Sequence, residues 1–250
     1  MYNIADTFIV GRFLGENALA AVGGTHTLIT FLYSIIIGLC MGCGSLVSYC
    51  FGERNKRRLK GCLNISFLMI GSVTLVTEPI PLCFSNVILK LLHTPMKIMF
   101  LTSDYVRIIL SGIIFIFLYN YYSFMLRGIG NSLTSLILLG SSSVLNIILD
   151  IIFVADLDMG VKGAAYATVI SQAVSGVGLC FYTLAKEPLL RLSFKKKSWK
   201  DSSFGEVLRM STTASVQRSV MNFGILMIQR LVNSFGTTVI AAFTVAVHNC

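Results

Sequence analysis

Long apolar runs divided by short charged loops make up most of this chain, and they leave few folds open to it. Hydrophobic residues account for 55% of its 250 positions and charged residues for only 12%, about half the charge of an ordinary soluble domain. About 20 apolar residues are enough for one helix to cross a bilayer. The chain is therefore predicted to be all-α, a polytopic bundle of membrane helices.

The predicted membrane spans follow one another closely along the chain. The first is too short to cross a bilayer alone, so we expect the rest of it to precede Met1. A further span is expected to begin near Gly236. The spans before it cover Met1–Arg12, Val22–Phe51, Cys62–Phe84, Ile98–Leu126, Leu133–Val154, Gly163–Ala185 and Val207–Val232.

Basic residues are concentrated in alternate loops, and this predicts the orientation of the spans. The loops at 53–60, 127–131 and 186–201 share one side and contain Arg54, Lys56, Arg57, Arg58, Lys60, Arg127, Lys186, Arg191, Lys195, Lys196, Lys197 and Lys200. The opposite loops contain Arg12, Lys90, Lys97 and Lys162. The positive-inside rule places the basic loops in the cytoplasm, which predicts a multi-pass protein of the cytoplasmic membrane.

The net charge of +9 is explained by these loops. Aromatic residues do not interleave with the basic runs, so the lipid bilayer is the expected partner and nucleic acid is not. The seven cysteines form no metal-binding pattern, and no resident cofactor is expected.

A short internal repeat predicts how the spans are grouped. Gly15–Val22 (GENALAAV) is similar to Gly236–Phe243 (GTTVIAAF), and repeats that span several helices are typical of two-lobed transporters. Residues 1–200 are therefore expected to form a six-helix amino-terminal lobe with an incomplete first helix. Residues 201–250 are expected to begin a second lobe with helix seven and part of helix eight, so the chain would be a fragment of a twelve-helix protein.

Two acidic residues lie inside predicted spans. Asp6 lies in Tyr2–Gly11 (YNIADTFIVG) and Asp150 in Asn146–Val154 (NIILDIIFV). A charge in hydrocarbon costs several kcal/mol, so such residues usually face a polar cavity and mark an ion or proton path. Asn146 and Asp150 are four residues apart and share one helix face. Their oxygens suit Na⁺, and a protonated carboxyl bonded to the amide would suit H⁺ equally.

Simpler interpretations of these residues remain open. Asn146 and Asp150 could be a polar pair that stabilises interhelical packing, and Asp6 could cap a helix end. Thr168 could be only a small residue that permits close helix contact. None of these alternatives is excluded by the residues themselves.

Several motifs in order resemble those of the multidrug and toxin extrusion (MATE) family, within the larger superfamily of multidrug, oligosaccharidyl-lipid and polysaccharide exporters. The similarity extends over nearly the whole chain. The motifs are Tyr2–Gly15 (YNIADTFIVGRFLG), Tyr105–Ile108 (YVRI), Leu126–Asn131 (LRGIGN), Asn146–Phe153 (NIILDIIF), Gly160–Thr168 (GVKGAAYAT) and Gln229–Ala242 (QRLVNSFGTTVIAA).

The resemblance implies a fold and a function. It implies twelve helices in two six-helix lobes around a central cavity that opens alternately to each side, with export of cationic compounds in exchange for Na⁺ or H⁺. By motif match, the coupling cation would be bound by Asp6 and Asp150 with Asn120, Asn146 and Thr168, and Na⁺ could bind at Asp6, Asp150 and Asn146. Small organic cations are the expected partners, and the full-length protein is expected to be a monomer.

An aromatic stretch, Phe115–Phe124 (FIFLYNYYSF), surrounds Asn120. Tyr119, Tyr121 and Tyr122 could offer ring faces to a cationic substrate, or they could form an interfacial aromatic belt. Asn120 lies about 10 Å along a helix from Arg127, whereas Asp6 and Asp150 are expected in the outer half of the membrane. Asn120 would then need a strongly tilted helix, or it would be a weaker ligand.

Other functions fit the sequence less well. A lipid-linked oligosaccharide flippase would need basic residues in its cavity, and Arg218 and Arg230 are the only candidates in the seventh span. An intramembrane aspartyl protease would need a Gly-x-Gly-Asp motif, which is absent, so no enzyme is expected. A non-functional fragment stays as an alternative.

Overall fold

The computed structural model describes residues 2–192, 204–236, 238–240 and 242–243, and this part of the chain is helical without strands. The helices are α1 (Tyr2–Leu14), α2 (Glu16–Gly52), α3 (Lys56–Thr77), α4 (Pro79–Leu91), α5 (Met96–Ser111), α6 (Ile113–Gly128), α7 (Leu133–Asp150), the π-helical turn η1 (Ile151–Asp156), α8 (Gly160–Lys186) and α9 (Phe204–Asn233). The predicted all-α class is therefore confirmed. Two predicted features lie outside the described residues: the basic residues Lys195, Lys196, Lys197 and Lys200, and positions 244–250 of the expected further span.

Three predicted spans are each built from two consecutive helices. The span at 62–84 breaks at Glu78, because Pro79 lacks the N–H that an uninterrupted helix needs. The span at 98–126 bends by 49° between α5 and α6, at Gly112, where a side chain would crowd Val169. The span at 133–154 is α7 followed by η1.

Four helical segments of the described chain are long and apolar enough to cross a membrane, or five if α5 and α6 form one bent span. They are Glu16–Gly52, Lys56–Ser85, Leu133–Asp156 and Gly160–Lys186. The predicted span in α9 is not among them, although α9 has 30 residues. Its stretch Met210–Arg218 (MSTTASVQR) carries hydroxyl and amide groups that lower its hydropathy.

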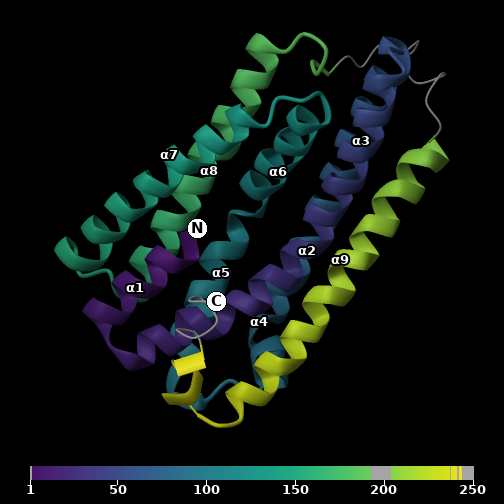
Figure 1. Ribbon diagram of the computed structural model, residues 1–250. Coiled ribbons are helices and arrows are strands. Elements are labelled where there is room, and N and C mark those ends of the chain that lie inside the picture. The colour runs from purple at the N-terminus through teal and green to yellow at the C-terminus, as the bar shows by residue number, and fades with distance from the viewer. Residues whose placement is uncertain (1, 193–203, 237, 241, 244–250) are drawn as a thin grey trace.

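Helix α2 is the central element of the bundle. Its 37 residues span about 55 Å and pack against α1, α3, α5, α6 and α9. Figure 1 shows α7 and α8 on one side of the molecule and α9 with α3 on the other, with α2 and α6 between them. At Gly38 and Gly42 the backbone of α9 comes so close that a Cβ atom would collide with it. Small residues permit this close approach of two membrane helices.

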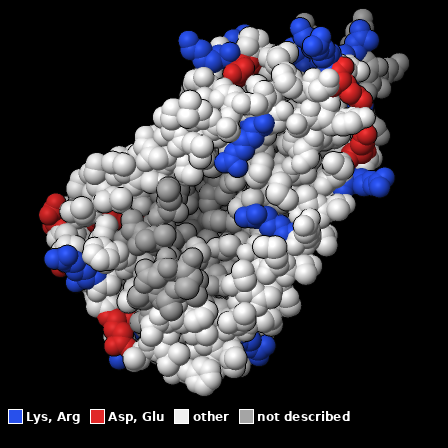
Figure 2. All heavy atoms as spheres, in the orientation of Figure 1, with Lys and Arg blue, Asp and Glu red and all other residues white. Residues whose placement is uncertain are grey.

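Polar and apolar side chains are distributed as expected for a lipid-facing bundle. The buried residues of α7 are all polar, namely Ser135, Ser142, Asn146 and Asp150, whereas Leu136, Ile137, Val144 and Ile148 are exposed. Figure 2 shows a largely uncharged face with a group of basic residues at its upper end and further ones on the middle of the face and at the lower end. Such a surface suits a bilayer around the middle of the bundle.

Candidate functional site

The two acidic residues singled out from the sequence meet inside the bundle. Asp6 comes from α1 and Asp150 is the last residue of α7, and both side chains are 0% exposed. Their carboxyl groups are close enough for a direct interaction. The contact arises because α1 packs against both α7 and α8.

Thr168 joins this pair from α8. Its hydroxyl lies 2.7 Å from Oδ2 of Asp6 and 3.0 Å from the backbone carbonyl of Ala164. A hydroxyl has one proton and two lone pairs, so it can donate to only one of these oxygens with full strength at a time. The structure thus brings Thr168 to the acid pair, as the motif match suggested.

Asn146 lies one helical turn before Asp150 and is also 0% exposed. It lies beside Asp6, but neither its amide nitrogen nor its oxygen makes a well-formed hydrogen bond within the described part of the chain. The same holds for Oδ1 of Asp6 and for both carboxyl oxygens of Asp150. Buried polar groups are nearly always bonded, so this cluster holds more acceptor atoms than the described residues around it satisfy.

Tyr105, on α5, is a further member of this cluster; it begins the YVRI motif but was not predicted as a site residue. Its side chain is 2% exposed and its hydroxyl interacts with Asp6. The adjacent Asp104, which forms a surface ion pair with Lys162 at 3.1 Å, suggests an exposed segment. The useful signal is helical spacing, because Tyr105 shares a face with Thr102 and Ile109, which are both buried.

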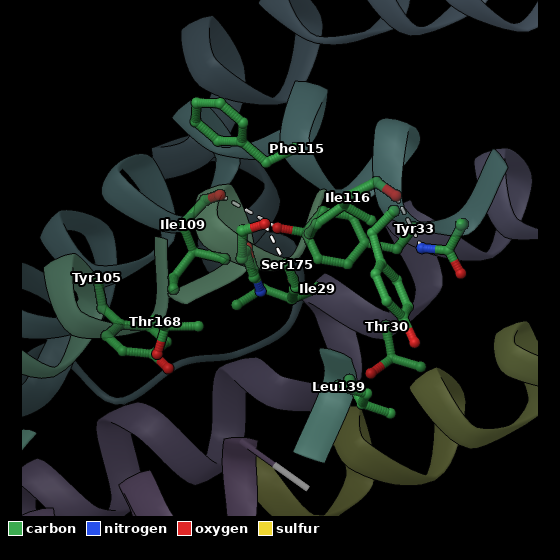
Figure 3. A pocket seen from close by; sticks show the side chains of 13 residues that line it. Ile29, Thr30, Tyr33, Tyr105, Ile109, Phe115, Ile116, Leu139, Thr168 and Ser175 are labelled. Atoms are coloured by element: carbon green, nitrogen blue, oxygen red, sulfur yellow. Dashed lines mark hydrogen bonds between the residues drawn. The ribbon is translucent and has the colours of Figure 1, made fainter. Parts of the chain in front are cut away.

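A cavity of about 200 Å³ adjoins the acid pair. Tyr105 and Thr168 lie beside each other at one end of it (Figure 3). Further polar groups come from Tyr33 and Ser175, and the hydroxyl of Tyr33 donates to the carbonyl of Ile109 at 3.1 Å. A cavity of this volume and polarity has room for several water molecules.

Asn120 lies on the wall of this cavity. Its side-chain amide nitrogen donates to the carbonyl of Ile116 in its own helix at 2.8 Å. The bend between α5 and α6 lets one chain segment contribute both Tyr105 and Asn120 to the same space. The span is therefore bent, and Asn120 lines the same cavity as Tyr105 and Thr168, whereas Asp6 and Asp150 are not among the residues that line it. The predicted role of Asn120 as a cation ligand stays a prediction.

The three tyrosines do not share one environment. Tyr119 lines the cavity and its hydroxyl donates to the carbonyl of Ser135 at 3.2 Å. Tyr121 and Tyr122 are at most 2% exposed and pack in the core, where both rings contact Phe67. Of the three tyrosines, only Tyr119 therefore lines this cavity, because successive helical residues point about 100° apart. The predicted contact of Tyr121 and Tyr122 with substrate stays a prediction.

The donor set determines which ligands the cluster suits. It offers carboxyl, amide and hydroxyl oxygens, and no group of three or more His, Cys, Asp or Glu side chains gathers anywhere in the described residues. Hard oxygen ligands suit a proton or a hard cation such as Na⁺, not a soft transition metal. The cluster is therefore a candidate cation site.

Known proteins resemble this chain over nearly all of its length. It is 29% identical to a probable multidrug resistance protein, YpnP, of Bacillus subtilis over 97% of the chain and 54% of that protein. It is 27% identical to the probable multidrug resistance protein NorM of Thermotoga maritima over 99% of the chain and 54% of that protein. The chain thus spans about half the length of these relatives.

Solved structures agree with this relationship. A ligand complex of the MATE multidrug transporter DinF-BH superposes with a TM-score of 0.83 at 27% identity, over 98% of this chain and 55% of that one. The inward-facing conformation of a multidrug resistance MATE family transporter gives a TM-score of 0.82 at 25% identity, over 97% and 56%. These proteins and the apolar helices described above identify a multi-pass membrane protein. The MatE family model matches residues 1–152, and the chain belongs to this family of membrane transporters.

Proposed function

We propose that this chain is the cation-binding part of an antiporter in the cytoplasmic membrane, which exports small organic cations in exchange for Na⁺ or H⁺. Residues 1–200 would form the lobe that holds the coupling cation, and α9 would begin the second lobe. Alternating access would then move the α9 side of the molecule against the lobe that contains Asp6 and Asp150.

One observation supports this proposal above all others, namely two touching buried carboxyl groups with no basic side chain of the described residues against them. Two carboxylates in contact in a low-dielectric interior repel each other strongly, so a proton or cation has to lie between them. The described part of the chain supplies no fixed cationic side chain there. A mobile cation taken from water and later returned to it meets this need.

The position of Thr168 is compatible with the acid pair both when a cation is bound and when none is bound. When Asp6 is ionised, the Thr168 hydroxyl can donate to it. When Asp6 is protonated or bound to Na⁺, the same hydroxyl can turn its proton toward the Ala164 carbonyl. Both states keep the hydroxyl proton in a hydrogen bond, so loading requires little rearrangement of α8.

The adjoining cavity provides a place where cation and substrate can influence each other. Its polar wall leads to Thr168 and Tyr105, and its aromatic wall includes Phe115 and Tyr119. Aromatic faces attract organic cations, and such a cation near an ionised acid pair would compete with H⁺ or Na⁺. Competition for one negative site is a direct way to couple export to import. An aromatic organic cation is therefore a suitable first substrate to test.

The test uses the full-length protein in proteoliposomes loaded with a fluorescent organic cation, with either a pH or a Na⁺ gradient imposed. We expect efflux under one gradient, and loss of that efflux in Asp150→Asn. Asp104→Asn is the matched control, because it removes a surface acid paired with Lys162. Gradient-driven efflux that survives unchanged in Asp150→Asn would falsify the proposal.

The same assay separates the two ions. If H⁺ is the coupling ion, efflux should follow the pH gradient without added Na⁺ and should slow as the pH of the outer solution rises. If Na⁺ is the coupling ion, efflux should follow the Na⁺ gradient at constant pH, and protons should act as competitors.

A further inference from the structure

A second cavity lies far from the acid pair, where α2 turns into α3. It has a volume of about 430 Å³ and is lined by Cys50, Phe51, Arg54, Lys56, Leu59 and Leu189. Leu189 belongs to the segment that follows α8, so three parts of the chain enclose the cavity. It lies at the basic end of the bundle, the upper end in Figure 2.

The two charged side chains that line this cavity are both basic. Arg54 and Lys56 are exposed at its edge, and no acidic residue is among those that line it. The nearby Glu53 and Glu206 are both held by Arg58, each at 2.7 Å. Among the described residues, Arg54 and Lys56 therefore form no ion pair, and their charges are free to meet an anion.

The rest of the cavity is apolar. The side chain of Leu59 is 2% exposed, and Phe51 is 42% exposed beside it. Arg54 lies in the short turn between α2 and α3. Its backbone φ of 56° is rare for a residue with a side chain. A soluble phosphate would use the cations but not the apolar surface, so the ligand should carry both an anionic and an apolar part.

The depth of the cavity identifies the source of such a ligand. Gly52 and Lys56 are the terminal residues of two candidate membrane spans, and both spans end at a basic loop, so we take the cavity to lie near the level of the lipid headgroups. Anionic lipids are attracted to basic residues at this level, and basic pockets between membrane helices on the cytoplasmic side bind their headgroups.

From this we infer that the cavity between the α2–α3 turn and Leu189 binds an anionic phospholipid of the leaflet that faces the basic loops. Arg54 and Lys56 contact its phosphate, and Phe51 and Leu59 contact the first part of its acyl chains. The inference does not depend on the proposed antiport, because it concerns a separate cavity and a different ligand.

The experiment measures thermal stability of the full-length protein in nanodiscs of phosphatidylcholine alone and of phosphatidylcholine with phosphatidylglycerol. We expect phosphatidylglycerol to raise the Tm of the wild-type protein, and the double variant Arg54→Gln/Lys56→Gln to lose most of this increase. Lipid retained by the protein in native mass spectrometry should fall about tenfold in that variant. Lys90→Gln/Lys97→Gln, at the opposite end of the bundle, is the control and should behave as wild type.

Two control measurements of Tm complete the experiment. Equal Tm values of both variants and the wild type in phosphatidylcholine alone would show that the substitutions do not unfold the protein. If phosphatidylglycerol stabilises the double variant as much as the wild type, the inference is wrong. Inorganic phosphate that gives the same increase in Tm as phosphatidylglycerol would also overturn it, because the acyl chains would then contribute nothing.

Discussion

Two groups of acidic residues in this molecule have opposite surroundings. Glu53 and Glu206 lie at the basic end of the bundle, with side chains 35% and 37% exposed, and both contact Arg58. Asp6 and Asp150 lie inside the bundle at 0% exposure and contact each other instead of a base. The first group forms a complete ion cluster that holds α9 to α2 and α3. The second group has no basic side chain of the described residues against it.

The difference separates a structural charge from a functional one. A partly exposed carboxylate costs little to keep charged, and a neighbouring guanidinium adds about 1 kcal/mol or less. A buried carboxylate costs several kcal/mol unless it is paired or neutralised. Two such groups without a base therefore need a proton or another cation between them, and the proposed antiport would use that cation.

The largest effect should come from giving the buried pair the base that it lacks. Asn146→Lys places an ammonium group one turn from Asp150, and a buried ion pair costs about 3–5 kcal/mol to break. We expect gradient-driven efflux to fall by about a hundredfold while the protein remains folded. Asn146→Met, of similar length but uncharged, should retain much more activity. Equal losses in the two variants would show that the added charge is not the cause.

A smaller effect is expected when the acid pair loses its hydroxyl partner. Thr168→Val removes the 2.7 Å contact to Asp6, and a hydrogen bond to a charged group contributes about 1.5–3 kcal/mol. The concentration of driving cation needed for half-maximal efflux should change about tenfold. It should fall if the ion is H⁺, because ionised Asp6 loses a stabilising donor, and rise if the ion is Na⁺, because the site loses an oxygen ligand. Thr168→Ser keeps the hydroxyl and should restore most of the wild-type cation dependence. A Thr168→Val protein with unchanged cation dependence would place Thr168 outside the site.

Tyr105→Phe should have a weaker effect of the same kind. It removes one neutral hydroxyl beside Asp6 and keeps the ring that fills the core, so about 1 kcal/mol is at stake. We expect about a fivefold change in the apparent affinity for the driving cation. Tyr121→Phe, which alters a core hydroxyl bonded to the Leu63 carbonyl, is the comparison and should leave cation dependence unchanged.

The smallest effect is expected at the complete cluster. Arg58→Gln leaves Glu53 and Glu206 without their base, and because both are partly exposed the loss of stability should be about 1 kcal/mol or less. The difference in Tm from the wild type should shrink further in about 1 M salt, where charges are screened within about 3 Å. Cation dependence of efflux should not change. A shift in that dependence would mean that the cluster acts on the buried site and that the two groups are not independent.

Much of this arrangement can be read from the sequence, and the remainder has physical reasons for being hidden. Hydropathy predicted the helices, and the four-residue spacing predicted that Asn146 and Asp150 share a face. The meeting of Asp6 with Asp150 and Thr168 required contacts between segments more than a hundred residues apart, which only the family motifs suggested.

Other features depend on helix phase and on local breaks. The bend at Gly112 could not be located, because many of the 21 glycines interrupt no helix. Tyr119 and Tyr121 look alike in the sequence, and only the rotation of α6 toward α2 and α3 decides which one faces the cavity. Tyr105 was not predicted as a site residue because the charged Asp104 next to it suggested an exposed segment.

The π-helical turn η1 has a consequence for how this region can change during evolution. Its wider turns, such as the bond from the Leu157 amide to the Ile152 carbonyl at 2.9 Å, accommodate a residue more than an α-helix of the same height would. The π-helical turn, which can gain or lose a residue with little change in height, begins immediately after Asp150. Insertions or deletions in the loop before α8 can therefore be absorbed within η1, and the spacing of Asn146 and Asp150 is insulated from the length of the loop that follows.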